Sequence, residues 1–301
     1  MKTFEYLGIQ CVELSNDWVS LYITQSVGPR LISLKAQGGE NLFASLPDAT
    51  LDCPGRGQFH LYGGHRLWHA PEQPSRTYIP DDAPVEIIPK GNGIQIKQAV
   101  EPDTAIQKTW DIQLAENAAR VEIEHTLTNA GLWPLTCAPW AITQMRPGGT
   151  ALLPQNLGLL EDYPTLPNRP ITLWPYTDIN SPHISWGNDL ILVQAAMKEG
   201  MLKIGFPNPR GWLAYWLDGT LFIKRSVYDP AAAYFDFGSS SECYCNDQFL
   251  ELETLGPITT LKPGEFVSHI ETWEVKPGVP WTDDLKDLIS LIEQPMQGSE
   301  A

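Results

Sequence analysis

The 301-residue sequence predicts an all-β protein, an antiparallel sandwich with one amphipathic helix near its C-terminal end. Segments in which apolar and polar residues alternate recur along the whole chain, which is typical of half-buried strands. The chain has 24 Gly and 26 Pro, so it is rich in turns. Clear helical periodicity occurs in one stretch. We expect roughly 15 or more strands, beyond the usual size of one sheet, and therefore packed sheets.

The strand signals of the first half are regular. Residues 19–23 alternate, and residues 27–34 contain a turn followed by a return strand. Ile94 and Ile96 lead into another strand, and residues 106–114 form the next. In residues 121–127 the apolar positions and His125 lie on one face and two Glu and one Thr lie on the other. We expect His125 to be a hydrogen-bonded core histidine.

The second half begins with the clearest hairpin signal. Residues 212–217 and 220–227 are separated by Asp218 and Gly219. Asp-Gly suits a two-residue type I′ turn, because both central residues of that turn need a positive φ. Residues 249–255 and 266–275 predict a second long strand pair, joined across a turn in which Pro263 and Gly264 fit type II.

One stretch, about 282–293, predicts a helix. Thr282 can cap its N-terminus, and the Asp residues that follow suit the helix dipole. Its apolar stripe consists of Leu285, Leu288, Ile289 and Ile292, which we expect to lie against a sheet. Pro295 should end the helix, and residues 295–301 should form a tail, frayed from Gly298. No low-complexity linker divides the chain, so we expect a single domain over residues 1–301.

The charge balance argues against two classes of partner. The 20 Lys and Arg and 36 Asp and Glu give a net charge of −16. Nucleic acid and anionic membrane surfaces both attract basic patches, so we expect neither as a partner. No window approaches about 18 unbroken apolar residues, and the first residues lack the features of a signal peptide. We expect a cytoplasmic protein that takes a neutral or cationic ligand.

The cysteines do not suggest a metal site. There are 5, without a CxxC pair. Cys243 and Cys245 would share one strand face, which is poor geometry for a four-ligand zinc site. We expect all of them to be buried small side chains in a reducing compartment.

The densest group of chemically active residues is His65, Arg66, Trp68, His69 and Glu72. If the segment is extended, the two histidines share a face about 13 Å apart at ~3.3 Å per residue, too far for one metal ion. Three interpretations stay open: a polar ligand pocket, a loop whose Trp packs and whose His side chains cap backbone groups, and a metal site.

Two further features stay open in the same way. Glu251 and Glu253 alternate with leucines, so both carboxylates lie on one strand face. That face is either a polar surface in water or the floor of a cleft. Arg30 follows a Gly-Pro turn and points either into a cleft or into solvent. The acidic pair Asp81 and Asp82 is interpreted as a solvated loop.

Several of these segments together resemble the aldose 1-epimerases. Residues 252–254, 261–265 and 269–275 look like the C-terminal signature of that family, in which Glu253 matches the catalytic glutamate. Residues 126–129 and 134–136 are similar to a second stretch, and His65 after Gly-Gly loosely resembles a family histidine. The phrases at 28–34, 39–42, 64–72, 138–141 and 250–257 resemble most closely an uncharacterised branch of the galactose mutarotase-like superfamily. The resemblance implies a β-supersandwich.

The sequence departs from the family at two positions. Where mutarotases carry a general-acid histidine, residues 137–143 contain none, and Leu255 replaces a family glutamine. Opening a pyranose ring needs a base for the anomeric hydroxyl and an acid for the ring oxygen. Glu253 is the expected base, and His65 or His69 the expected acid. His125 is the other candidate acid, although its position on the apolar face favours a core histidine. We therefore expect His65, Arg66 or His69 near Glu253 on one concave sheet face.

The resemblance implies a sugar or sugar derivative as ligand, and no cofactor is expected. The expected substrate-binding residues are Arg30, Arg66, Trp68, Glu72, Trp140 and Glu251. The leading hypothesis is a carbohydrate-active, mutarotase-like protein with an aldose epimerase or related sugar chemistry based on Glu253. The alternatives are a carbohydrate-binding protein without catalysis and a cupin-type metal enzyme that uses His65, His69 and Glu72.

Overall fold

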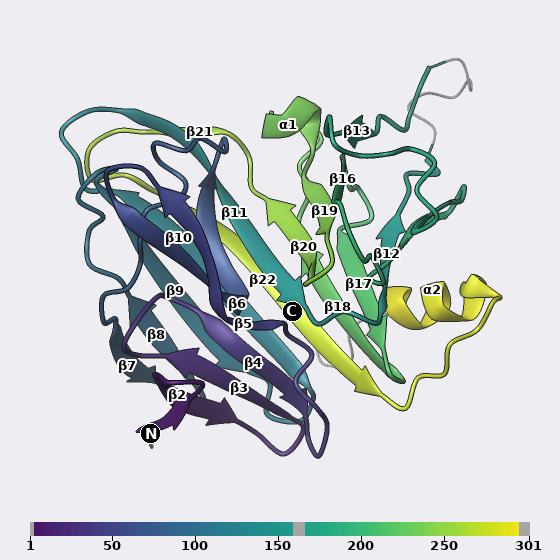
Figure 1. Cartoon of the computed structure of the whole chain (residues 1–301), viewed down its shortest axis with the longest axis horizontal. Coiled ribbons are helices and arrows are strands. Elements are labelled where there is room, and N and C mark those ends of the chain that lie inside the picture. The colour runs from purple at the N-terminus through teal and green to yellow at the C-terminus, as the bar shows by residue number, and fades with distance from the viewer. Residues whose placement is uncertain (1–2, 159–165, 295–301) are drawn as a thin grey trace.

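The computed structural model describes residues 3–158 and 166–294, which form two antiparallel sheets (Figure 1). The first sheet has 12 strands and the second has 10. The prediction of an antiparallel β-sandwich with a short C-terminal helix is confirmed. Pro295 and the tail at 295–301 lie outside the described residues. The single domain over 1–301 stays a prediction.

The first sheet carries the candidate site. Its strands, in spatial order, are β1 (Thr3–Tyr6), β2 (Ile9–Ser15), β3 (Val19–Thr24), β4 (Leu31–Ala36), β6 (Gly57–Ala70), β11 (Leu135–Met145), β20 (Leu250–Leu255), β19 (Ser241–Cys245), β16 (Leu202–Phe206) and β13 (Thr172–Leu173). Off this path, β5 (Ser45–Cys53) pairs with β6, and β21 (Thr259–Leu261) pairs with β11.

The second sheet covers one face of the first. Its order is β14 (Ile184–Trp186), β15 (Leu190–Gln194), β12 (Thr150–Pro154), β17 (Trp212–Leu217), β18 (Thr220–Ser226), β22 (Phe266–Pro277), β10 (Arg120–Asn129), β9 (Ile106–Leu114), β8 (Gly93–Lys97) and β7 (Glu86–Lys90). One buried apolar cluster contains residues of both sheets, among them Leu67, Leu252 and Trp273. The space between the sheets is therefore the main core.

The hairpin at residues 212–226 is confirmed. Asp218 has φ 48° and Gly219 has φ 77°, as a type I′ turn requires. The second predicted pair is wrong. β20 pairs with β11 and β19, whereas β22 pairs with β10 and β18 in the other sheet. The predicted turn at Pro263 and Gly264 is present, but the short strand β21 precedes it and carries the chain from one sheet to the other.

The C-terminal helix is shorter than predicted at its start. Helix α2 spans Leu285–Glu293, and its N-cap is Asp284, whose carboxylate accepts from the Lys286 amide. Thr282, the predicted N-cap, instead accepts from the Asp284 amide, so the observed N-cap lies two residues later than predicted. Leu288 and Ile292 pack with apolar residues of β12, β17 and β18. Figure 1 shows α2 beside these strands.

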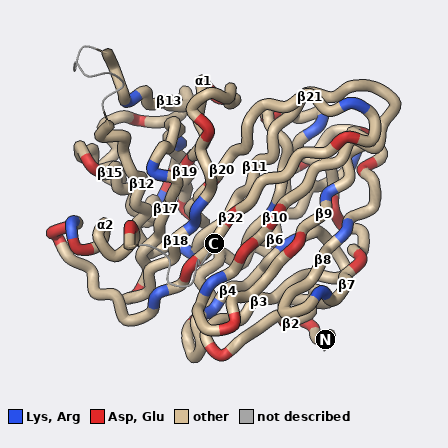
Figure 2. The backbone as a smooth tube through the Cα atoms, turned by 180° about the vertical axis from the view of Figure 1, so that it is seen from behind, with Lys and Arg blue, Asp and Glu red and all other residues tan. Residues whose placement is uncertain are grey.

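The cysteines are buried, as the sequence predicts, and charged residues occur on both sheets (Figure 2). Figure 2 shows acidic and basic positions distributed over both sheets. All five cysteines are free and buried. In the described ranges, neither α2 nor the short helical segment α1 (Phe235–Gly238) is long and apolar enough to cross a membrane.

Candidate functional site

The polar residues of strand β6 point to two opposite faces of the first sheet. Successive side chains of a strand alternate in direction. Leu67 packs in the core between the sheets, and His65 shares that parity. Arg66 and Trp68 therefore point to the other face of the first sheet, which we call the outer face. The segment is a central strand, so the interpretation as a loop is wrong.

The strand register continues the outer face from β6 across three more strands, β11, β20 and β19. Trp68 lies opposite Trp140 of β11, and Ile142 of β11 lies opposite Glu253 of β20. Glu253 in turn lies opposite Glu242 of β19. Residues that are 185 positions apart, Arg66 and Glu251, meet on this surface.

A cavity of about 520 Å³ opens over this face. Its volume falls in the usual range of small-molecule sites, about 300–1,000 Å³. Aromatic rings and charged groups share the lining. The lining residues are Ala49, Thr50, Leu51, Leu61, Arg66, Trp68, Glu72, Tyr78, Trp140, Tyr176, Met201, Lys203, Tyr244, Asn246, Gln248, Phe249 and Glu251. Aromatic faces beside polar groups suit the mixed apolar and hydroxyl surface of a sugar.

Arg66 and Glu251 form an ion pair in the cavity wall. Arg66 Nη2 donates to Glu251 Oε1 at 2.8 Å, and Gln144 Nε2 donates to the same oxygen at 3.0 Å. Burial raises the pKa of Glu251, and the Arg66 charge opposes that shift. The guanidinium carbon lies 4.2 Å from the Trp68 ring centroid. Arg66 Nε and Nη1 are buried without a hydrogen-bond partner among the described residues.

Glu253 is fully buried beneath two residues of the cavity lining. Its Oε2 accepts from Trp140 Nε1 at 2.7 Å and from Lys203 Nζ at 3.0 Å. Its Oε1 is buried and has no partner in the described part of the chain. The interpretation of this strand face as a surface in water is therefore wrong, since Glu251 is 8% exposed and Glu253 is 0% exposed.

Lys203 links Glu253 to a second carboxylate. Its Nζ lies 2.7 Å from Glu242 Oε2 and 4.7 Å from the ring centroids of both Trp140 and Trp174. On the opposite wall, the Tyr78 hydroxyl donates to Glu72. Burial, followed by this contact, raises the pKa of Tyr78. Burial also raises the pKa of Tyr244 to about 12, so both phenols are neutral donors at neutral pH.

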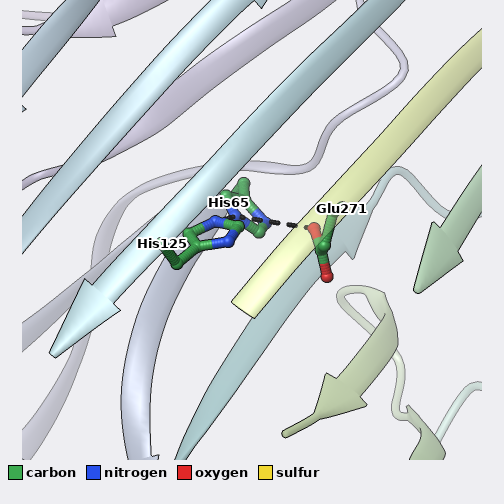
Figure 3. A group of neighbouring side chains, drawn as sticks. All are labelled: His65, His125 and Glu271. Atoms are coloured by element: carbon green, nitrogen blue, oxygen red, sulfur yellow. Dashed lines mark hydrogen bonds and ion pairs between the residues drawn. The ribbon is translucent and has the colours of Figure 1, made fainter. Parts of the chain in front are cut away.

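His65 belongs to a polar cluster between the sheets, on the opposite face from Glu253. Its Nδ1 contacts Thr143 Oγ1 at 2.9 Å, and its Nε2 contacts His125 Nε2 at 2.8 Å. Figure 3 shows the His65 and His125 rings side by side, with Glu271 next to them. His125 Nδ1 lies 3.1 Å from the His269 carbonyl oxygen, so we assign its proton there. His65 then donates from Nε2, and the Thr143 hydroxyl donates to its Nδ1.

Two charged residues complete this cluster. Lys224 Nζ lies 2.9 Å from Glu271 Oε1 and donates to the carbonyl oxygens of Ala141 and Leu252 at 2.9 and 3.1 Å. Trp273 Nε1 donates to Glu271 Oε2 at 2.9 Å. Burial lowers the pKa of Lys224. Burial alone would raise the pKa of Glu271, but the Lys224 charge and the neighbouring histidines outweigh this effect and lower that pKa. The cluster is thus a satisfied core network.

The same cluster offers ligand atoms within 4.8 Å of one another from His65, His125 and Glu271. A divalent cation there would replace the His65–His125 hydrogen bond and would stand close to the buried Lys224 ammonium. Both effects oppose metal binding. The predicted cupin-type set is also not formed. His65 contacts His125, His69 Nε2 lies 3.8 Å from Glu101, and Glu72 contacts Tyr78 in the cavity.

Arg30 and His69 are also away from the cavity. Arg30 is fully buried and pairs with Asp81 at 2.9 Å, so it points neither into the cleft nor into solvent. This contact corrects the interpretation of Asp81 as solvated, because a buried guanidinium needs a buried counter-charge. His69 is 1% exposed, and its Nδ1 accepts from Arg76 Nε at 3.2 Å.

The predicted site residues therefore lie in separate places, some at the cavity and others away from it. Arg66, Trp68, Glu72, Trp140 and Glu251 line the cavity, and Glu253 lies beneath it. His65 and His69 face the other way, which corrects the expectation that one of them is the acid beside Glu253. The sequence analysis missed Lys203 and Glu242. The available signal was a single charged residue within each otherwise apolar or uncharged strand, 202–206 and 241–245.

The buried histidines predict a titration that NMR can measure. Burial, as the largest cause, lowers the pKa of His125 and of His269 to about 4. An unfolded histidine titrates near 6.5. Between about pH 6.5 and 4 the unfolded chain binds more protons at these two sites, so their contribution to stability is present above that window and is lost as the pH falls through it.

We expect the imidazole proton resonances of His125 and His269 to stay in their neutral form from pH 7 down to about 5. The resonances can be assigned from the variants His125→Asn and His269→Asn. Titration of both groups near 6.5 would contradict the prediction. Glu242, whose pKa is raised by burial, opposes the effect on overall stability, so the resonances are the direct readout.

Comparison with known proteins supports the fold. No protein-family model matches the sequence, and no curated protein sequence matches it. Among solved structures, a TPR-domain containing protein from Parabacteroides distasonis superposes with TM-score 0.62 at 15% identity, over 91% of this chain and 48% of that one. This chain thus spans about half of that protein's length.

Two further structures are matched over nearly their whole length. A galactose mutarotase-like protein from Lactobacillus casei gives TM-score 0.56 at 12% identity, over 88% of this chain and 100% of that one. A protein proposed to be a mutarotase, from Salmonella typhimurium, gives TM-score 0.55 at 12% identity, over 91% and 93%. The chain therefore has the galactose mutarotase-like fold, as the resemblance predicted.

Proposed function

We propose that this chain binds a monosaccharide in the cavity over β6, β11 and β20 and interconverts its anomers, with Glu253 as the base. The observation that carries the proposal is the state of the Glu253 carboxylate. One of its oxygens is held by Trp140 and Lys203, and the other is buried and unpartnered. A buried, oriented carboxylate with a free oxygen is suited to accept a proton from a hydroxyl.

The surrounding residues support a sugar as the ligand. A sugar hydroxyl both donates and accepts, and the Arg66–Glu251 pair offers free guanidinium donors beside a carboxylate. Trp68 and Trp140 supply aromatic surface in the same wall. We propose a neutral or amine-bearing sugar as the small-molecule partner, in a protein of the cytoplasm, where free buried thiols stay reduced.

A binding protein without catalysis is the second candidate. The chain has 6 histidines, all in the described ranges, and none of them lines the cavity. Such a protein would keep the aromatic wall and the Arg66–Glu251 pair. Glu253 would then hold Trp140 and Lys203 in place.

A sugar panel followed by polarimetry separates these candidates. Free aldohexoses, aldopentoses and N-acetylhexosamines are titrated by calorimetry, and each binder is dissolved as one anomer in the presence of the protein. The proposal expects the optical rotation to relax faster in proportion to protein concentration. Binding with relaxation at the spontaneous rate would leave the second candidate, and absence of binding across the panel would contradict both.

A further inference from the structure

Ring opening needs a proton donor at the ring oxygen, and none of the histidines in the described ranges lines the cavity. On the basis of the proposed function, we infer that Lys203 is the general acid of this site and that Glu242 is the positioning residue that returns a proton to it. Three sets of observations support this assignment: the contacts of Lys203, the burial of the two carboxylates beside it, and the proton balance of the reaction.

Lys203 is the ammonium group that both lines the cavity and contacts Glu253. An ammonium group has three N–H bonds. Nζ donates to Glu253 Oε2 at 3.0 Å, and Glu242 Oε2 lies 2.7 Å from Nζ as an ion-pair partner. The donor that Glu253 does not use is left for a ligand oxygen on the cavity side. The Trp140 and Trp174 rings, both 4.7 Å away, restrict where the ammonium can move.

The two carboxylates that contact Lys203 cannot both be charged without cost. Glu242 and Glu253 are register partners on neighbouring strands, and both are 0% exposed. Two buried negative charges beside one positive charge leave an uncompensated charge in a medium of low dielectric. Burial raises the pKa of Glu242 well above its usual value, the Lys203 charge opposes this shift, and the nearby Glu253 and Asp236 charges add to it. Glu242 is therefore the carboxyl that keeps its proton.

The proton balance of the ring-opening step is complete. Glu253 takes the proton of the anomeric hydroxyl, and the bond between the anomeric carbon and the ring oxygen breaks. Glu242 gives its proton to Lys203 as Lys203 gives one to the ring oxygen, because, despite its burial, the Glu242 and Glu253 charges otherwise hold the pKa of Lys203 well above its usual value. The products are an open-chain aldehyde, a neutral Glu253, a charged Lys203 and a charged Glu242. Ring closure on the other face of the aldehyde reverses each transfer.

The test uses conservative variants of the full chain. Lys203→Arg keeps the positive charge, but a guanidinium does not release its proton. We expect its anomerisation rate to fall about 100-fold, at the low end of the effect of a positioned acid. Glu242→Gln should lower the rate about tenfold and should remove the alkaline limb of the pH–rate profile, where Glu242 would lose its proton. Sugar affinity should stay within about tenfold in both.

The chain contains a matched control pair. Lys108 of β9 and Glu101 form an ion pair at 2.6 Å, and their side chains are 6% and 2% exposed. This pair is not in the cavity lining. Lys108→Arg and Glu101→Gln should therefore leave the rate and its pH profile unchanged, which separates the chemistry from the effect of altering a buried ion pair.

The outcomes distinguish this inference from the proposed function. If wild type accelerates anomerisation but Lys203→Arg keeps the wild-type rate, Lys203 is not the acid, although the function stands. An unchanged alkaline limb in Glu242→Gln would remove Glu242 from the mechanism. If wild type binds sugar without accelerating anomerisation, both the function and this inference are wrong. If Lys203→Arg does not fold, Lys203→Gln with sugar binding retained provides the same comparison.

Discussion

Glu253→Gln should lower the anomerisation rate by ~10²–10⁴-fold while changing sugar affinity by less than about tenfold. Glutamine keeps the shape of the side chain and an acceptor oxygen for Trp140 and Lys203, but it cannot accept a proton. Lys203 keeps its contact with Glu242, which can ionise once the Glu253 charge is removed, so the fold should survive. Polarimetry gives the rate, and isothermal titration gives the affinity.

Glu251→Gln is the matched control, because Glu251 is on the same strand face and also lines the cavity. Its Oε1 is already engaged by Arg66 and Gln144. We therefore expect this variant to weaken binding more than it slows the chemical step. If Glu251→Gln loses the rate and Glu253→Gln retains it, the base is Glu251, and the residue carried over by resemblance is wrong.

Lys224→Met should lower the free energy of unfolding by about 3–5 kcal/mol. Lys224 and Glu271 are both 0% exposed and lie 2.9 Å apart between the sheets. Removal of the lysine leaves a buried carboxylate without its counter-charge, together with two backbone carbonyls that lose their donor. Urea unfolding followed by circular dichroism measures the change, provided that the slope with urea stays constant.

Two further variants test the reason for that loss. Lys224→Met combined with Glu271→Leu removes both charges and should be more stable than Lys224→Met alone. Lys262→Met removes an ion pair whose side chains are 76% and 50% exposed, and it should change stability by less than about 1 kcal/mol. Equal losses in Lys224→Met and Lys262→Met would contradict the account of the buried network.

The comparison of prediction with structure shows where sequence reasoning was sufficient. Residues 106–114 were predicted as a strand and coincide with β9, because alternation and flanking turn residues are encoded locally. The error at residues 249–275 has a different origin. A strand, a turn and a strand predict a hairpin locally, but here β20 and β22 pair with strands more than 100 positions earlier in the sequence, β11 and β10.

The candidate site was predicted in part for the same reason. Because side chains alternate along a strand, the sequence correctly placed Glu251 and Glu253 on the same face of one strand. It likewise placed His65 and His69 on the same face of another strand. The alternation of side chains within each strand does not show which face of β6 lies on the same side of the sheet as which face of β20. Pairing through β11 decides it, and it brings Arg66 to the side of Glu253 while it directs His65 to His125.

The sequence by itself determined the β class, most strand positions, the type I′ hairpin and the amphipathic helix, because each depends on neighbours within a few residues. Only the tertiary structure decided that Lys203, 50 positions before Glu253, lies between it and Glu242. It also placed Asp81 beside the buried Arg30. Buried charges need partners, and long-range strand pairing supplies those partners, so the site residues that sequence reasoning missed are those that non-local packing brings together.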